Sequence, residues 1–458
     1  MTIAIPKKSD RHQPIYREIA EAIGREIRTG RSRPGSRLPT QRELAQQLGV
    51  TLTTVTRAYR EAQRRGLVSG EVGRGTYVRS ADFDPEQTPQ EPATINLGIN
   101  SLMPLPHVEE LADRLSATIS HRVAASVFDY QPHAGSLRSR AAGALWIART
   151  GLDVSPDRVV VTAGGQHAIL IALLALTKPG DEILIEEFSY PGAIDLCGRL
   201  NLKRRMLPMD RHGLLPDALD KACRSGNAKT LYVMPTLQNP TSAVMPEGRR
   251  REIAAVVRKH GLMVIEDDVY GYLVPDATPL SHFVPEEQAL YITSTSKSIA
   301  PGMRIGYMRA SARLIEPLSA AILRTMVNAP PVMAELANRL ITDGTAVRIV
   351  EWKRREIAAR QEIACRVLKG FRYQTHPISP HLWVYLPEGW RAEMYVTEAK
   401  ERGVLVNAAD AFAVEHKTSV QAVRICLGPP RSRAELEDAL VRLAKLPEQV
   451  REPNKLIV

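Results

Sequence analysis

The chain has 458 residues, and its 61 Lys and Arg against 50 Asp and Glu give a formal charge of +11. This length exceeds one ordinary domain of about 100–200 residues, and a hydrophobic content of 44% excludes a wholly disordered chain. The longest apolar run, Ala168 to Leu176, is far below the ~20 residues that cross a bilayer. Four widely separated cysteines show neither a disulfide framework nor a CxxC metal site, so we expect a cytoplasmic protein without a metal.

The positive charge is concentrated at the N-terminal end. Residues 1–80 hold 16 Lys and Arg against 7 Asp and Glu, whereas residues 81–458 hold 45 against 43. Between them lies ADFDPEQTPQEPATI, residues 81–95, with three prolines, four acids and no basic residue. Proline fixes φ and removes a backbone donor, which favours an extended linker over a surface loop within one domain. The predicted division is residues 1–80, a linker at 81–95, and residues 96–458.

The sequence of residues 1–80 predicts three helices followed by a β-hairpin. Isoleucines recur every four residues across 14–29, the spacing of an amphipathic helix. Thr40 and Glu43 have capping-box spacing and open a second helix, and a tight turn separates it from a third helix at 51–66. Residues 67–79, LVSGEVGRGTYVR, predict two strands around a Gly-rich turn. This order is typical of a winged helix-turn-helix.

The start of the third helix carries threonines and an arginine, which suit contacts with phosphates and base edges in a major groove. A solvated basic helical bundle is the alternative. Residues 14–79 resemble the GntR family through PGSRLPTQRELAQQLGV, TTVTRAYREAQRRGLV and GRGTYV. Some members carry Arg at the positions of Leu52 and Thr56, so the operator sequence does not follow from the resemblance. The residues expected to contact DNA are Arg42, Thr51, Thr53, Thr54, Arg57 and Arg74.

After the linker, apolar strands alternate with helical stretches. Runs rich in Val, Ile and Leu occur at 158–163, 181–187, 229–235 and 262–268. Such alternation indicates an α/β fold with a largely parallel sheet covered by helices on both faces. Ligands of these sheets bind beyond the carboxyl ends of the strands, so the residues that follow each strand are candidates for a site.

Polar or aromatic residues follow each of these strands. The sequence GGQ at 164–166 opens a helix, where free N–H groups attract anions, and Tyr190 follows the second strand with a flat ring. Asn239 follows the third strand, and the fourth ends in the acids 266–268, which need a cationic partner if buried. Taken singly, a glycine pair more often makes a tight turn than a ligand site, and a loop tyrosine is more often packed against the protein than against a ligand.

Residues 294–306, with the pattern SxSKxxxPGxRxG, supply the cationic partner. Lys297 lacks the preceding glycines of a phosphate-loop NTPase, which excludes that class. Together with the residues at the strand ends, the segment supplies what pyridoxal phosphate needs: a lysine for the aldehyde, a carboxylate for the ring nitrogen and anion-binding groups for the phosphate.

In these motifs, residues 96–446 resemble the fold-type-I aminotransferases. The resemblance implies Lys297 as the catalytic Schiff-base lysine and Asp267 as the partner of the pyridine nitrogen. Asp267 is chosen over Asp268 because it has the family's three-residue offset from Tyr270. The other implied cofactor contacts are Tyr270 and Asn239 at the ring hydroxyl, Tyr190 on the ring face, Gly165, Gln166, Ser294 and Arg304 at the phosphate, and Tyr130 at the phosphate of a neighbouring subunit.

Two further positions follow from the same resemblance. In VRICLG, Arg424 stands where family members bind the substrate carboxylate, a task that suits a planar, bidentate guanidinium. Ser242 stands where the family's NPTG motif has glycine, which leaves the shape of the turn beside Asn239 open.

A GntR-like head joined to an aminotransferase-like body resembles the MocR subfamily of bacterial transcriptional regulators. The resemblance implies a homodimeric, DNA-binding regulator whose body holds pyridoxal phosphate and senses an amino acid, an amine or the cofactor itself. An effector that binds two arrangements of the body unequally would change how two heads are spaced on DNA. The alternatives are a catalytically active aminotransferase with a DNA-binding head and a GntR regulator whose body binds no cofactor.

Overall fold

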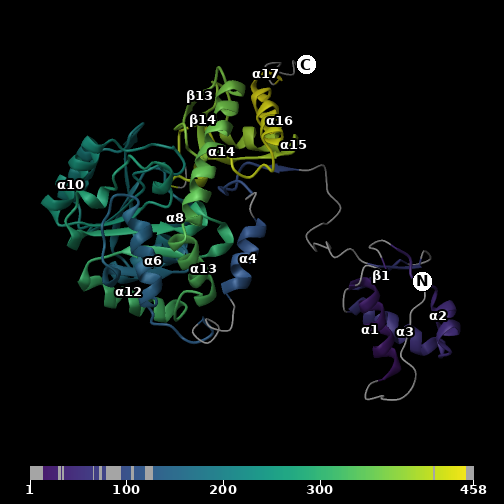
Figure 1. Ribbon diagram of the computed structural model, residues 1–458. Helices are drawn as coiled ribbons and strands as arrows, with labels where there is room; N and C mark the ends of the chain where they lie inside the picture. The colour runs from purple at the N-terminus through teal and green to yellow at the C-terminus, as the bar shows by residue number, and fades with distance from the viewer. Residues whose placement is uncertain are drawn as a thin grey trace, which may run out of the picture. The chain divides into compact units, whose positions relative to one another are not determined.

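The computed structural model describes residues 14–28, 32, 36–64, 67–71, 75–78, 94–104, 108–118, 127–415 and 418–449. The chain forms two compact units, Met1–Pro92 and Ala93–Val458, which we call the head and the body (Figure 1). Most of the predicted linker lies outside the described residues. Its last residue, Ile95, already belongs to a strand of the body, β3 (Ile95–Asn96). Within the described residues, we find no helix long and apolar enough to cross a membrane.

The head has the predicted order of three helices and a hairpin. The capping box forms, since the Glu43 amide donates to Thr40 Oγ1 at 3.3 Å and the Thr40 amide donates to Glu43 Oε2 at 2.8 Å. Gly49 then ends the second helix with φ of 65°, in the left-handed region that favours glycine. The elements are α1 (Ile15–Arg28), α2 (Gln41–Leu48), α3 (Leu52–Arg64), β1 (Val68–Glu71) and β2 (Gly75–Val78).

A small apolar core holds the head together. Ile19 and Ile23 of the predicted isoleucine stripe are fully buried against Val55 and Tyr59 of α3 and against Leu44 of α2. The Tyr59 hydroxyl donates to the Pro39 carbonyl at 2.7 Å, and this bond fixes the chain that enters α2. Burial of one face of each helix leaves the opposite face of α3 exposed to solvent.

The body is built on a seven-stranded sheet of order β4-β12-β11-β10-β9-β5-β6. All strands run in one direction except β12, which is antiparallel to both of its neighbours, so the sheet is largely parallel as predicted. In sequence order the strands are β4 (Val159–Thr162), β5 (Glu182–Glu186), β6 (Lys203–Leu207), β9 (Thr230–Val233), β10 (Met263–Asp267), β11 (Ala289–Ser294) and β12 (Gly306–Arg309).

Alternate residues of the central strands β5, β9 and β10 face two separate apolar cores. Ile183 and Ile185 enter one core while Leu184 enters the other, and Ile265 and Val264 divide in the same way. Both faces are therefore covered by helices, which explains why the strands are continuously apolar. One face carries α7 (Gly165–Leu176), α8 (Pro191–Arg199) and α12 (Ala312–Thr325). The other carries α9 (Pro216–Ser225), α10 (Glu247–His260) and α6 (Leu137–Ala148), and α13 (Pro331–Thr342) packs on α6.

A long helix, α14 (Thr345–Val367), leads from this sheet to a second, antiparallel sheet of order β13-β14-β17-β16 (Figure 1). Ile349 and Ile357 of α14 pack in the core of the first sheet, and Ala364 packs in the core of the second. The remaining elements are α4 (Val108–Thr118), α11 (Thr295–Ser298), α15 (Ala392–Glu401), α16 (Arg433–Ala444), α17 (Leu446–Gln449), β7 (Met209–Asp210), β8 (Gly213–Leu214), β13 (Arg372–Gln374), β14 (His381–Tyr385), β15 (Val404–Leu405), β16 (Asn407–Ala408) and β17 (Ala422–Cys426).

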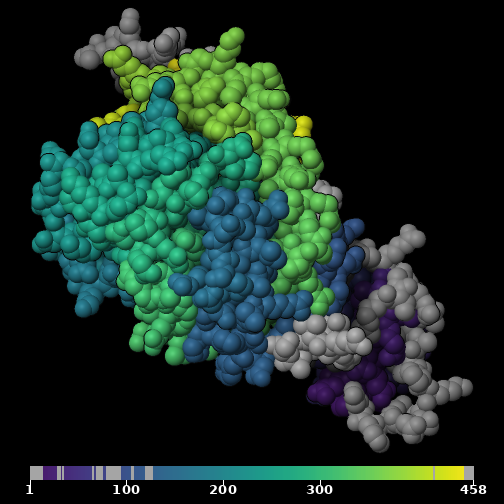
Figure 2. Space-filling view, turned by 60° about the vertical axis from the view of Figure 1, so that its left-hand side comes forward, coloured from purple at the N-terminus to yellow at the C-terminus, as the bar shows by residue number. Residues whose placement is uncertain are grey.

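Helix α6 packs closely on strand β12 at a glycine. In the space-filling view, the blue surface around α6 borders the green surface of α13 and α14 (Figure 2). On the inner side, a Cβ atom added to Gly143 would lie 2.4 Å from Cδ1 of the buried Tyr307 ring. The absence of a side chain at residue 143 is therefore what lets the helix approach the sheet.

We expect Gly143→Ala to lower the free energy of unfolding by about 1–3 kcal/mol, the usual cost of overpacking a core. Urea unfolding of the full chain would measure it. Gly248→Ala is the matched control, because a Cβ atom there meets no heavy atom within 4 Å and Gly248 lies in the first turn of α10. It should leave stability unchanged or raise it by up to about 1 kcal/mol. Equal unfolding midpoints for the two variants would contradict this packing.

Candidate functional site

One cavity of about 330 Å³ collects the predicted site residues of the body. It lies beyond the carboxyl ends of β4, β5, β9, β10 and β11, because parallel strands end at one edge of a sheet and their loops meet there. Of the predicted cofactor and carboxylate contacts, those that line the cavity are Gly165, Gln166, Tyr190, Asn239, Asp267, Tyr270, Ser294, Lys297, Arg304 and Arg424.

Lys297 lines this cavity, and burial changes the chemistry of its amine. Lys297 lies in the one-turn helix α11, and its amine donates to the carbonyl of Asn100. Burial lowers the pKa of Lys297 to about 8, and the nearby positive charge of Arg424 acts in the same direction. A lysine with a lowered pKa is partly neutral near physiological pH, and the neutral amine is the nucleophile.

A second buried lysine holds the turn that carries Lys297. The amine of Lys353, on α14, donates to the carbonyl of Lys297 at 3.1 Å and to that of Ile299 at 2.7 Å. Burial lowers the pKa of Lys353 to about 7, and the charge of Lys297 acts in the same direction. Lys353 therefore fixes the backbone from which the Lys297 side chain projects.

Asp267, at the end of β10, is the carboxylate that faces the cavity. Its Oδ2 accepts a hydrogen bond from the Tyr232 hydroxyl at 2.6 Å, whereas its buried Oδ1 has no partner among the described residues. Burial raises the pKa of Asp267 to about 6. Asp268 does not line the cavity and accepts instead from the Tyr291 hydroxyl at 2.8 Å. Of the two neighbouring acids, only Asp267 lines the cavity.

The start of α7 and the Arg304 side chain both line the cavity. The first N–H groups of a helix have no intrahelical acceptor and favour an anion, as does a guanidinium. The Arg304 guanidinium donates to Ser296 Oγ at 3.2 Å and to the Ala163 carbonyl at 3.3 Å. A Cβ atom on Gly164 would lie 2.9 Å from Arg304 Nη2, so the glycine pair leaves room for the guanidinium.

Arg424, on β17, also lines the cavity. Its guanidinium donates to Asn239 Oδ1 at 2.8 Å and to the Gly98 carbonyl at 2.6 Å, and lies 4.5 Å from the centre of the Phe412 ring. The buried Nε atom has no partner among the described residues. These contacts fix the orientation of a planar cation that is only 4% exposed, as recognition of a carboxylate requires.

Two tyrosines complete the wall, and a serine shapes the turn beside it. Burial raises the pKa of Tyr190 and of Tyr270, so both hydroxyls stay protonated at neutral pH. Ser242, whose place in the turn was left open by the sequence, has φ of 61°, a conformation that favours glycine. Its hydroxyl donates to the His381 carbonyl at 2.8 Å, so the turn beside Asn239 keeps this conformation without glycine.

Comparison with known families matches both units of the chain. The family described as "Aminotransferase class I and II" matches residues 92–443, and "Bacterial regulatory proteins, gntR family" matches residues 15–78. The chain belongs to the aminotransferase class I and II family. With its gntR head, it is a transcriptional regulator of the MocR type. The head indicates DNA as a partner, and the body indicates a small-molecule ligand.

Individual relatives show the same two-part arrangement or the body alone. The chain is 30% identical over 445 residues to the Bacillus subtilis HTH-type transcriptional regulator YdeF, covering 96% of each chain. It is 28% identical over 314 residues to the 2-aminoadipate transaminase of Thermus thermophilus, covering 66% of this chain and 78% of the enzyme. A crystal structure of α-aminoadipate aminotransferase from Thermus thermophilus, complexed with N-(5'-phosphopyridoxyl)-L-leucine, matches with a TM-score of 0.70 and 24% identity over 78% of this chain and 92% of that one.

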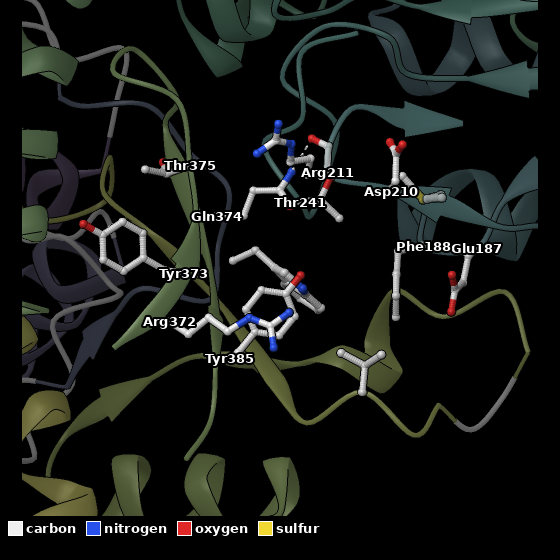
Figure 3. Close-up of a pocket in the computed structure, with 13 residues that line it drawn as sticks. Glu187, Phe188, Asp210, Arg211, Thr241, Arg372, Tyr373, Gln374, Thr375 and Tyr385 are labelled. Atoms are coloured by element: carbon white, nitrogen blue, oxygen red, sulfur yellow. Dashed lines mark hydrogen bonds between the residues drawn. The ribbon is translucent and has the colours of Figure 1, made fainter. Parts of the chain in front are cut away.

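The body of this MocR-type regulator also has a larger cavity, of about 610 Å³ (Figure 3). It lies between β13 and β14 on one side and the residues after β5 on the other. The Arg372 guanidinium lies over the Tyr385 ring at 4.3 Å, and Gln374 donates to the Arg211 carbonyl at 3.0 Å. None of the predicted site residues lines this cavity. The chemistry of the lining, rather than the volume, therefore assigns the site to the smaller cavity.

The remaining predicted residues lie apart from the cavity. In the head, Arg42, Thr51, Thr53 and Arg57 are exposed and Thr54 is half-buried, whereas Arg74 lies outside the described residues. In the body, Tyr130 is 84% exposed and does not line the cavity of its own chain.

Sequence reasoning missed several residues of the site. Asn100 and Asn407 line the cavity from distant parts of the chain, and Phe412 packs on Arg424, with no local motif to indicate them. Lys353 has no local signal either, since it occupies one position of a long helix. Ser296, which also lines the cavity, could have been found because it is the second serine of the SxSK pattern.

We expect Lys297 to react with an amine-selective acylating reagent with a midpoint near pH 8 in the cofactor-free protein, because burial lowers its pKa. Peptide mass spectrometry would follow the labelling, with the exposed Lys259 as an internal control for the reagent. The negative charge of Asp267 raises the pKa of Lys297, so Asp267→Asn should move the midpoint to lower pH. A midpoint near 10, ordinary for lysine, would contradict this environment.

Proposed function

We propose that the body binds pyridoxal phosphate at Lys297 and that an amino acid or amine reaching this cavity changes how the regulator binds DNA. The observation that carries the proposal is the unpaired, buried Oδ1 of Asp267 in one cavity with Lys297. A buried carboxylate oxygen without a partner is costly unless a ligand supplies a donor. A protonated pyridine nitrogen is such a donor.

The other residues fit the rest of the cofactor. When bound, pyridoxal phosphate supplies an aldehyde that reacts with amines and a ring that withdraws electrons. The start of α7 at Gly165 and Gln166, with Arg304 and Ser294, would hold the phosphate. The remaining contacts are proposed for Tyr190 on the ring face and for Tyr270 and Asn239 at the ring hydroxyl.

The effector class follows from two groups that line the cavity. Lys297 is the position at which an amine would exchange, and the oriented guanidinium of Arg424 suits a carboxylate. An amino acid, which has both an amino group and a carboxylate, satisfies both groups. A simple amine satisfies only the first.

We further infer a homodimer in the cytoplasm, where DNA is accessible. Tyr130 supports the dimer, because it is exposed on its own chain and would reach the phosphate of the partner's cofactor. The effector must favour one arrangement of the paired bodies over another, since a ligand of equal affinity for both shifts nothing. The favoured arrangement would then set the spacing of the two heads on DNA half-sites.

Borohydride reduction of protein loaded with pyridoxal phosphate should fix the cofactor on Lys297, since that amine is the one buried in the cavity. Mass spectrometry of the Lys297 peptide and the absorbance of the bound cofactor would follow the reaction. Lys297→Ala should lose the adduct. A colourless, unmodified wild-type protein would overturn the cofactor assignment and support a body without cofactor.

Replacing Arg424 should separate two classes of effector. Arg424→Gln removes a charge-assisted contact, so amino acids should need about 10- to 100-fold higher concentration to change the cofactor spectrum or DNA affinity. Amines without a carboxylate are the matched control and should act on both proteins equally. An equal loss for both ligands would instead indicate a disturbed cavity. Rapid, selective transamination with a keto acid would favour the aminotransferase alternative over a purely sensory body.

A further inference from the structure

The first residue of the recognition helix is an exposed leucine. Leu52 opens α3, and its side chain is 45% exposed. In the part of the head that the structure describes, it is the only large apolar side chain so exposed. An isolated leucine on a surface needs no explanation elsewhere. Here it occupies the first turn of the helix whose N-terminal residues meet base edges in a helix-turn-helix.

The hydroxyls around Leu52 are engaged within the head. Thr56 donates to Gln41 Oε1 at 2.7 Å, a bond that ties α3 to α2. The hydroxyls of Thr51 and Thr54 are 2.8 Å apart and bond to each other, and Thr51 Oγ1 also accepts from the Thr54 amide at 3.3 Å. Thr56 is therefore committed to the fold, whereas Leu52 is free to meet a partner.

The chemistry of leucine restricts what it can recognise in a major groove. Each base presents hydrogen-bond donors or acceptors there, and the 5-methyl group of thymine is the apolar exception. Leucine can neither donate nor accept, and covering a polar base edge without replacing its hydrogen bonds is costly. We propose that Leu52 contacts the 5-methyl group of a thymine in each operator half-site and selects thymine over cytosine at that position. The proposal rests on DNA binding by the head.

The test begins with the operator itself. The full-length protein selects duplexes from a random DNA pool, and the selected sequence identifies the thymines of each half-site. Each thymine is then replaced singly by deoxyuridine, which pairs in the same way and lacks only the 5-methyl group. Affinities are measured at one fixed salt concentration, because phosphate contacts make DNA affinity strongly salt-dependent.

At one thymine per half-site, deoxyuridine should weaken binding by the wild-type protein about three- to fivefold, the effect of burying one methyl group. Leu52→Ala should bind the thymine duplex more weakly and lose the difference between thymine and deoxyuridine. Restoring the methyl group on cytosine, as 5-methylcytosine, should recover part of the wild-type affinity. Leu52→Arg should shift the selected base toward guanine, because arginine pairs with its O6 and N7 atoms.

Thr56→Val is the matched control on the same helix. It removes the bond to Gln41 and should lower the unfolding midpoint of the head while leaving the ratio of thymine to deoxyuridine affinity unchanged. The proposed contact of Leu52 with a thymine methyl group is overturned if deoxyuridine weakens binding of the wild-type and Leu52→Ala proteins equally at every position. It is likewise overturned if deoxyuridine has no effect on the wild-type protein, which would indicate that a protein surface covers Leu52. Failure to select any duplex would instead contradict DNA binding as such.

Discussion

The body buries several charged side chains at one edge of its seven-stranded sheet, and the arrangement of the site depends on how these charges are paired. Lys297, Asp267, Arg304 and Arg424 all line one cavity of about 330 Å³. Charged groups removed from water are costly unless they are paired or hydrogen-bonded, and here the pairing is partial. Tyr232 satisfies one oxygen of Asp267, and no described residue satisfies the other. The fold therefore brings together a set of polar groups that only a ligand would complete.

Helix α14 bonds to the chain segments beside two residues of this cavity, Lys297 and Arg424. Lys353 holds the turn of Lys297, and Arg360, two helical turns later and on the same face, donates to the carbonyls of Leu427 and Pro430 at 2.7 and 3.0 Å. Those carbonyls follow β17, the strand that carries Arg424. One helix thus holds the backbone beside both the amine and the guanidinium. A change at either end would act on both sheets, since α14 packs in the cores of both.

The parts of the site that could be predicted were those encoded by local spacing. The capping box at Thr40 and the parallel strands each depend on residues a few positions apart, and the structure contains both. The same kind of spacing selected Asp267, which lines the cavity, and its role toward a ring nitrogen stays a prediction. The contact of Lys297 with Asn100 joins residues 197 positions apart, so no local pattern could indicate it. Lys353 was missed for the same reason. The turn at Ser242 was undecided because its conformation depends on a hydroxyl bond to β14, which becomes visible only in the fold.

The head and the body share one property at the residues to which we assign function. In each, the polarity of a side chain does not match its surroundings. In the body, Asp267 Oδ1 is polar, buried and unpaired; in the head, Leu52 is apolar and half exposed. Departures from consistent burial and pairing concentrate at functional sites, because selection for binding tolerates what selection for stability would remove. Each conflict is relieved by the partner proposed for it, a ring nitrogen in one case and a thymine methyl group in the other. A ligand that binds only the folded chain raises its free energy of unfolding by mass action. Both proposed partners should therefore compensate for the stability that is lost at these two positions in the free chain.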